Sequence, residues 1–164
     1  MKKFELTSEF VTFLGKTLFR IKALVSFGDV AEGELGGFIE RENNLDQSGN
    51  AWVSGDAKVF GNAWVYGDAK VFGDARVCGD ARVFGNAWVQ NCRDYSATSC
   101  FGSENRTTTF FRTKDGGISV RCGCFYGTLR EFREKVKERH GDSRLAKEYL
   151  MLADLMEFRL SKDE

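Results

Sequence analysis

From Asn50 to Val89 small, branched and polar residues recur with a period of six residues, as Gly-Asn/Asp-Ala-x-Val-x. Alanine and valine stand two places apart, so they share one face of a strand. Glycine followed by Asn or Asp favours a corner, because glycine reaches positive φ at little cost and Asn and Asp hydrogen-bond locally. Short strands separated by corners, with one inward face, predict a parallel β-helix.

The inward positions are nearly uniform along these repeats. One column holds valine and the other alanine: Val53, Val59, Val65, Val71, Val77, Val83 and Val89, with Ala51, Ala57, Ala63, Ala69, Ala75, Ala81 and Ala87. We expect both columns to fill the interior of the coil. Function is therefore expected at the outward positions that flank each valine.

The segment before the regular repeats keeps the six-residue step less strictly. Ile39 and Leu45 are six apart, whereas Leu45 and Val53 are eight apart, so the register slips by two residues. We predict a β-helix over 30–90, with an irregular first coil over 30–49. A β-hairpin within 4–27, with its turn at Gly15-Lys16, is expected to form an N-terminal cap over 1–29.

The C-terminal third predicts a different element. Residues 91–105 are expected to form a connecting loop, and 106–164 a hairpin followed by two helices. The hairpin strands are 106–112 and 118–124, joined by a Lys-Asp-Gly-Gly turn. Thr128 and Glu131 form a capping box that opens the first helix, which ends at Gly141. The second helix is expected from about Ser143 to Arg159.

The repeat resembles the left-handed β-helix of hexapeptide-repeat proteins, in which three hexads make one triangular coil. The segments 17–22, 35–40 and 49–53 are similar to hexapeptide-repeat proteins encoded by bacteriophages and prophages. The resemblance implies a mainly β protein: a short left-handed parallel β-helix with an N-terminal hairpin cap and a C-terminal hairpin plus two helices. It also implies a homotrimer with the coils side by side.

Composition narrows the function classes. The chain has 164 residues, a net charge of zero and five cysteines. Zero net charge argues against nucleic acid as a partner, and the absence of a long apolar run argues against a membrane partner. An odd cysteine count and no apolar leader predict a cytoplasmic protein, in the host cell if it is phage-encoded. No motif implies a cofactor.

The single histidine argues against catalysis. Acyltransferases of the hexapeptide family use a histidine at the subunit cleft, and carbonic-anhydrase-like members need three for a metal. This chain has only His140, at the end of the first predicted helix and outside every coil. We therefore predict a protein that is not an enzyme, with acyl transfer as an alternative.

The cysteines leave a second alternative. Cys92, Cys100, Cys122 and Cys124 would together supply the donors of a four-thiolate zinc site. Their spacing departs from the usual C-x-x-C knuckles, so burial as small apolar residues is favoured over metal binding.

Outward residues stack in columns if three hexads make a coil. One column then holds Trp52, Lys70 and Trp88, and the spacing predicts Lys70 between two indoles, a cation–π arrangement. A second column stacks Trp64 over Arg82. Exposed aromatic area of this kind marks an interface, so self-association is expected.

Aromatic residues beside cations suit planar anionic molecules. The segment 106–139 adds nine Lys/Arg against four Asp/Glu. We predict a non-catalytic oligomer that holds a small anionic, nucleotide-like ligand in intersubunit clefts, with a phage sponge for host immune signals as its concrete form. A structural trimerisation or assembly module is the alternative. The predicted ligand-binding residues are Trp52, Trp64, Tyr66, Lys70, Phe72, Arg82, Phe84, Trp88, Arg112 and Arg121.

Overall fold

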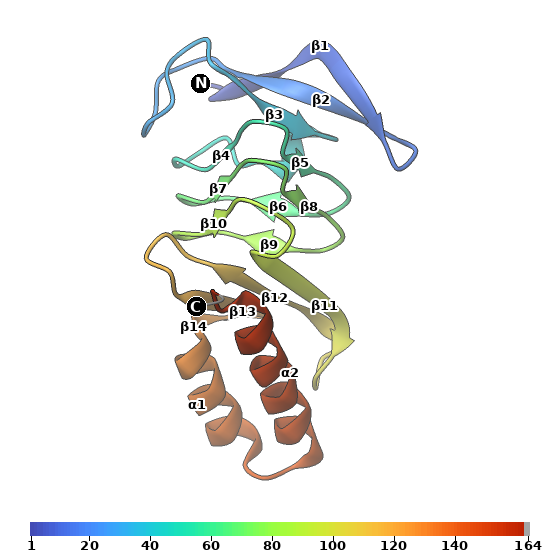
Figure 1. The fold of residues 1–164 in the computed structure, drawn as a ribbon, viewed down its shortest axis with the longest axis vertical. Helices are drawn as coiled ribbons and strands as arrows, with labels where there is room; N and C mark the ends of the chain where they lie inside the picture. Colours follow the sequence, from blue (N-terminus) through green and yellow to red (C-terminus); the bar gives the residue numbers. More distant parts are fainter. Residues whose placement is uncertain (163–164) are drawn as a thin grey trace.

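Seven two-residue strands, each the x-Val pair of one hexad, form the middle of the molecule (Figure 1). The computed structural model describes residues 1–162. The strands are β4 (Trp52–Val53), β5 (Lys58–Val59), β6 (Trp64–Val65), β7 (Lys70–Val71), β8 (Arg76–Val77), β9 (Arg82–Val83) and β10 (Trp88–Val89). Strands eighteen residues apart pair in parallel, which gives the small sheets β4-β7-β10 and β6-β9 and the pair β5-β8. The sequence prediction of a β-solenoid is confirmed.

The interior of the solenoid consists of the two predicted columns. Every alanine and valine of the repeat is at most 1 % exposed. The glycine at each corner has positive φ, and the corners stack closely: a Cβ added to Gly67 (φ 69°) would lie 3.0 Å from the amide nitrogen of Gly85. Glycine is therefore required there both for its backbone conformation and for the close approach of the next coil.

The first coil is irregular, as predicted. β3 (Leu35–Ile39) pairs with β5 so that Ile39 faces Val59, and Leu45 bridges to Val65. In each pair the two residues are twenty positions apart in the sequence instead of eighteen, so the two extra residues lie between Leu45 and Val53. A short 3-10 helix, η1 (Glu42–Asn44), precedes Leu45.

An antiparallel hairpin covers the N-terminal end of the solenoid. β1 (Phe4–Phe13) pairs with β2 (Lys16–Ala23), and β2 pairs with β3, so the hairpin extends the sheet that contains β5 and β8. The hairpin prediction is confirmed, but its turn lies at Leu14-Gly15, one residue earlier than expected, because both residues adopt positive φ. The second strand also ends at Ala23 instead of continuing to Phe27.

Lys3 is buried where this hairpin meets the first coil. Its ammonium group donates to the carbonyls of Ser48 (3.2 Å), Gly49 (3.4 Å) and Ala51 (2.9 Å). Burial lowers the pKa of Lys3 from 10.5 to about 8, because the charged form loses its hydration. The folded state therefore releases this proton at a lower pH than the unfolded chain.

This shift predicts a pH dependence of stability. Between pH 8 and 10.5 the unfolded chain binds more protons at Lys3 than the folded chain does, so the free energy of unfolding rises with pH. The stability difference between the natural chain and Lys3→Met is expected to grow in favour of the natural chain across that window, in urea titrations. The exposed Lys2→Met is the control, and a difference that stays constant with pH would contradict the account.

The C-terminal element is larger than the sequence predicted. β11 (Tyr95–Phe101), β12 (Arg106–Arg112), β13 (Ile118–Cys122) and β14 (Phe125–Thr128) form one four-stranded antiparallel sheet. The prediction of a connecting loop over 91–105 is wrong, because β11 pairs with β12. The predicted hairpin of 106–112 and 118–124 is therefore only part of this sheet, and β14 follows directly after its second predicted strand.

Two helices complete the chain as predicted. In α1 (Leu129–His140), Thr128 Oγ1 accepts from the Glu131 amide (3.2 Å) while Glu131 Oε2 accepts from the Thr128 amide (2.7 Å), and Gly141 ends the helix. α2 (Arg144–Leu160) is capped by Ser143. Residues 163–164 of the predicted C-terminal element lie outside the described residues.

The C-terminal sheet separates two cores. Phe111 packs against the valines and alanines of the solenoid, whereas its neighbour Phe110 packs against the helices with Val120, Phe132 and Met156. This alternation follows from the two-residue period of β12. The sheet therefore covers the C-terminal end of the solenoid, with the helices on its far side (Figure 1). Within residues 1–162 no helix has the length and apolar character needed to cross a membrane.

Candidate ligand-binding face

The solenoid has three outward faces, and other parts of the chain cover them to different extents. On the face of β4, β7 and β10, Trp52 is only 3 % exposed, because the rings of Phe4 and Phe27 pack edge-on against it at 6.5 and 5.4 Å. The prediction of Trp52 as a ligand-binding residue is therefore wrong. Its side chain points outward from the coil and is covered by the N-terminal hairpin and the loop that follows it.

Lys70 has the predicted register but a different partner. It lies between Trp52 and Trp88 in the β4-β7-β10 sheet, yet its ammonium group binds Asp29 of the N-terminal loop. That hydrogen bond is the main cause of the lowered pKa of Asp29. The predicted cation–π contact of Lys70 with the indoles is not formed within residues 1–162.

The C-terminal part of the β4-β7-β10 face is not covered by the hairpin. Trp88 is 37 % exposed and packs edge-on against Phe72, with ring centroids 5.0 Å apart. The cation over the Trp88 ring is Lys114, from the turn between β12 and β13, at 5.6 Å. Phe72 and Trp88 thus form a small aromatic patch next to a cation.

The face of β5 and β8 is covered by the tip of the N-terminal hairpin. Phe13 packs against Phe60 at 5.7 Å, and the side chains of Lys58 and Arg76 lie over the Phe13 ring at 5.6 and 4.8 Å. The cations of this face are therefore used in contacts with the hairpin.

The face of β6 and β9 carries a continuous row of rings, which we call the aromatic ladder: Trp64, Tyr66, Phe84 and Tyr126. Trp64 and Tyr66 stack at 4.0 Å, Tyr66 and Phe84 stack at 4.7 Å with planes 3° apart, and Tyr126 continues the row at 4.2 Å from Phe84. The first three side chains are partly exposed, and Tyr126 is 44 % exposed. The ladder therefore presents aromatic surface to the outside of the molecule.

Two guanidinium groups lie on the ladder. Arg82 is 5.6 Å from the Trp64 ring centroid, and Arg121 is 5.5 Å from that of Phe84. Arg82 and Arg121 form no ion pair with any carboxylate of residues 1–162. Burial raises the pKa of the Tyr66 hydroxyl, and both arginines oppose this rise, so their positive field reaches the middle of the ladder.

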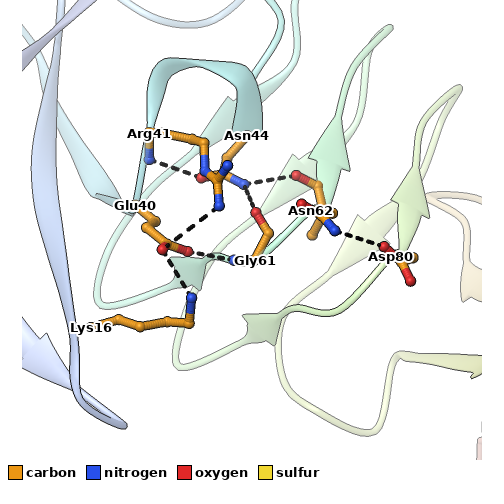
Figure 2. A network of polar contacts seen from close by, with 8 residues as sticks. Lys16, Glu40, Arg41, Asn44, Gly61, Asn62 and Asp80 are labelled. Atoms are coloured by element: carbon orange, nitrogen blue, oxygen red, sulfur yellow. Dashed lines mark hydrogen bonds and ion pairs between the residues drawn. The ribbon is translucent and has the colours of Figure 1, made fainter.

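A polar groove of about 660 Å³ borders the Trp64 end of the ladder. Arg41, Asn62, Trp64, Asp80 and Arg82 contribute to its lining. Figure 2 shows how the groove is held: the Asn62 amide donates to Asp80 at 3.1 Å, and the buried Asn44 donates to the carbonyls of Gly61 and Ala63 at 3.1 and 2.9 Å. The groove therefore offers fixed carboxylate and amide groups beside two arginines.

Glu40 fixes the wall of the groove. It accepts from the Lys16 ammonium at 2.9 Å and from the Gly61 amide at 2.6 Å, with Arg41 at 3.8 Å (Figure 2). The hydrogen bond from Lys16 is the main reason that the pKa of Glu40 is lowered. The carboxylate is thus held ionised and ties the hairpin to the second coil.

Arg112 takes a role within the fold. Its guanidinium pairs with Asp94 at 2.9 Å and donates to the backbone carbonyls of Leu160 (2.6 Å) and Ser161 (3.1 Å). These bonds attach the end of α2 to the C-terminal sheet. The hydrogen-bond donors of Arg112 are thus occupied by groups of the chain itself.

The structure thus brings together Trp64, Tyr66, Arg82, Phe84 and Arg121 from the predicted set, and adds groups that the sequence analysis missed. Asn62 and Asp80 are eighteen residues apart, so the same spacing applied to the corner positions would have found this pair. Asn44 lies in the irregular first coil, where the register is twenty residues and this spacing does not apply. Tyr126 has no such signal, since it comes from the separate C-terminal sheet.

His140 lies at the end of α1, where its ring stacks on Tyr149 at 5.7 Å, and it belongs to no coil. Of the residues that the structure describes, no three or more His, Cys, Asp and Glu side chains are grouped closely enough to hold a metal ion. Cys92, Cys100, Cys122 and Cys124 thus form no such group within residues 1–162.

Comparison with known protein families identifies the YdcK beta solenoid repeat at residues 75–91, the segment that contains β8, β9 and β10. This match supports a β-solenoid repeat protein and agrees with the stacked coils. Comparison with curated proteins finds no match to this chain.

Proposed function

We propose that the protein is a non-catalytic binding protein that holds a small, planar, anionic ligand of the nucleotide class against the aromatic ladder. One observation carries this proposal: three stacked rings, continued by the tilted ring of Tyr126, are accompanied by two guanidinium groups that have no carboxylate partner. Stacked rings provide a surface for a planar base, and unpaired guanidinium groups bind phosphate or carboxylate.

The groove provides the third group of contacts. A base stacked on the ladder places its sugar towards the Trp64 end, where Asn62 and Asp80 supply hydrogen-bond acceptors for hydroxyl groups. Base stacking on an aromatic side chain contributes about 1–3 kcal/mol. Each charge-assisted hydrogen bond contributes about 1.5–3 kcal/mol. The three kinds of contact together suit a nucleotide better than a purely apolar or purely anionic molecule.

The assembly that we propose is a homotrimer of left-handed hexapeptide-type coils placed side by side. A threefold ring requires contact between two different faces of neighbouring copies. The open patch of Phe72 and Trp88 on one copy and the aromatic ladder on the next are the two aromatic surfaces that such a contact would join, with Lys114 beside the resulting cleft. Light scattering at a mass three times that of one chain is the expected result.

The biological role that we propose for ligand binding is sequestration. We propose that the chain acts in the cytoplasm as a phage-encoded sponge for nucleotide signals of host immunity. The proposal rests on the resemblance of 15–90 to phage proteins and on the ladder chemistry. A structural assembly module is the second candidate, favoured by the contact chemistry of Phe72 and Trp88. The distance of His140 from every coil in the chain makes acyl transfer the weakest of the three.

Thermal unfolding in the presence of cyclic and ADP-ribose-type nucleotides tests the proposal. A ligand at 100 times its Kd is expected to stabilise the folded chain by about 2.7 kcal/mol, which raises the Tm by several degrees. Arg82→Ala with Arg121→Ala is expected to remove the rise. If no nucleotide of the panel raises the Tm at millimolar concentration, the structural-module candidate replaces this one.

A further inference from the structure

We propose that a second pocket, in the C-terminal element, binds a small organic anion with a planar apolar body. The pocket has a volume of about 490 Å³ and lies between the C-terminal sheet and α1, with Tyr149 of α2 in its lining. Pockets of this size hold small-molecule ligands. It is separate from the polar groove, and Tyr126 is the residue that borders both this pocket and the aromatic ladder.

The floor of the pocket is apolar and rigid. Phe132 is buried and packs against Phe125 at 5.7 Å and edge-on against Tyr149 at 5.8 Å, with Val136 beside it. The Tyr149 hydroxyl accepts from the amide of Ser103 at 3.2 Å, which fixes the ring. A floor of fixed aromatic rings favours a flat apolar group lying against it.

The rim of the pocket is basic. Arg106, Lys135 and Arg139 line it, against the single carboxylate of Glu104. Arg106 and Arg139 form no ion pair with any other side chain of residues 1–162, and Lys135 has only an exposed pair with Glu138 at 3.1 Å. The chain as a whole has zero net charge, so this local excess of positive charge is a property of the pocket and not of the composition.

Two further features complete the site. Gly123 has φ of 58° in the tight turn between β13 and β14, and a Cβ there would lie 3.8 Å from the guanidinium of Arg106. Arg106 thus lies over this turn at the pocket mouth. The His140 ring stacks on Tyr149 and adds an N–H donor to the basic side of the pocket.

The chemistry of floor and rim defines the ligand class. An aromatic ring system covers the apolar floor, and one carboxylate, sulfonate or phosphate group meets Arg106 and Arg139. The rim arginines distinguish such a molecule from a neutral ring of the same shape. This pocket does not require the aromatic ladder to bind anything, so the inference stands independently of the proposed function.

A matched pair of fluorescent probes tests the inference. 8-Anilinonaphthalene-1-sulfonate carries the anionic group, and N-phenyl-1-naphthylamine is its neutral counterpart. We expect one sulfonate probe to bind per chain. We also expect Arg106→Ala with Arg139→Ala to weaken its binding at least about 10-fold, as the loss of charge-assisted hydrogen bonds requires. Binding of the neutral probe is expected to change by less than about 2-fold, since only the floor holds it.

Arg130→Ala is the control, because Arg130 lies on the exposed side of α1 and pairs with Glu134. Two results would overturn the inference: sulfonate binding that is unchanged in the Arg106/Arg139 variant, or binding that is lost equally in Arg82→Ala with Arg121→Ala. The second result would place the probe on the aromatic ladder. The probe titration can be interpreted even if no nucleotide raises the Tm of the protein. The two proposals are therefore tested separately.

Discussion

Replacing Val77 with aspartate is expected to prevent the chain from folding. Val77 is fully buried among the alanines and valines of adjacent coils, whose side chains offer no hydrogen-bond donor to a carboxylate. An unpaired buried charge costs about 4–5 kcal/mol or more. Domains of this size are stable by only about 5–15 kcal/mol. Circular dichroism of the purified variant should show the loss of cooperative unfolding.

Arg76→Asp is the matched control, one residue earlier on the same strand. Its side chain points outward and contacts the Phe13 ring at 4.8 Å. The loss of that contact is expected to cost about 1 kcal/mol. A Val77→Asp chain that unfolds at the same denaturant concentration as Arg76→Asp would show that the inward column does not support the fold.

The second large effect is expected at the proposed ligand site. Replacing both Arg82 and Arg121 with alanine removes the two guanidinium groups of the aromatic ladder while leaving its rings in place. Losing about 1.5–3 kcal/mol per charge-assisted hydrogen bond lowers affinity by about 10²–10⁴-fold for the pair. Isothermal titration with the nucleotide that stabilises the natural chain most strongly measures this directly.

Arg76→Ala controls for the loss of a surface arginine, since it removes a guanidinium from a different face of the same solenoid. It is expected to change affinity by less than about 2-fold, as its field at the ladder is screened by solvent. Equal losses in the two variants would mean that net charge, and not the ladder, determines binding.

The solenoid was predictable because its signal is repeated. Each hexad contains the same inward Ala/Val pair and the same corner, so an error at one position changes the prediction little. The pairing of Trp64 with Arg82, eighteen residues later, follows from the period alone. The two helices were predictable for another reason: Thr128 with Glu131, and Ser143, are local capping signals that need no knowledge of the rest of the chain.

What the sequence did not predict depends on contacts between distant segments. Trp52 occupies an outward position, and only the packing of Phe4 and Phe27 onto it shows that it is buried. Lys70 likewise finds Asp29 through the fold of the N-terminal loop. The six-residue period of the solenoid does not indicate which of its outward residues the N-terminal segment will cover.

β11 was missed because its sequence carries a weak strand signal. Ser, Ala, Thr and Cys dominate Tyr95–Phe101, and the side chains are only partly buried, so the alternation of apolar and polar positions is poor. Pairing with β12 supplies the stability that the segment lacks alone. Tyr126 reaches the aromatic ladder by the same route, through a sheet whose position relative to the solenoid is set by tertiary packing.

The three faces of the solenoid have similar sequences but differ in how far other segments cover them. Lys58 and Arg76 contact the hairpin, and Lys70 pairs with Asp29, so their charges are used within the chain. Arg82 and Arg121 lie on the aromatic ladder, and Lys114 lies over Trp88, without a carboxylate partner among residues 1–162. The capping segments thus leave the aromatic ladder and the small patch of Phe72 and Trp88 uncovered.

Nitrogen-15 spectra of the tryptophan indoles test this central claim most directly, because the chain has three tryptophans in three different environments. Trp64 lies on the aromatic ladder, whereas Trp52 is buried under the hairpin. On titration with the nucleotide that stabilises the protein, the Trp64 signal is predicted to shift to saturation while that of Trp52 stays in place. A Trp64 signal that does not move at saturating nucleotide would contradict the account.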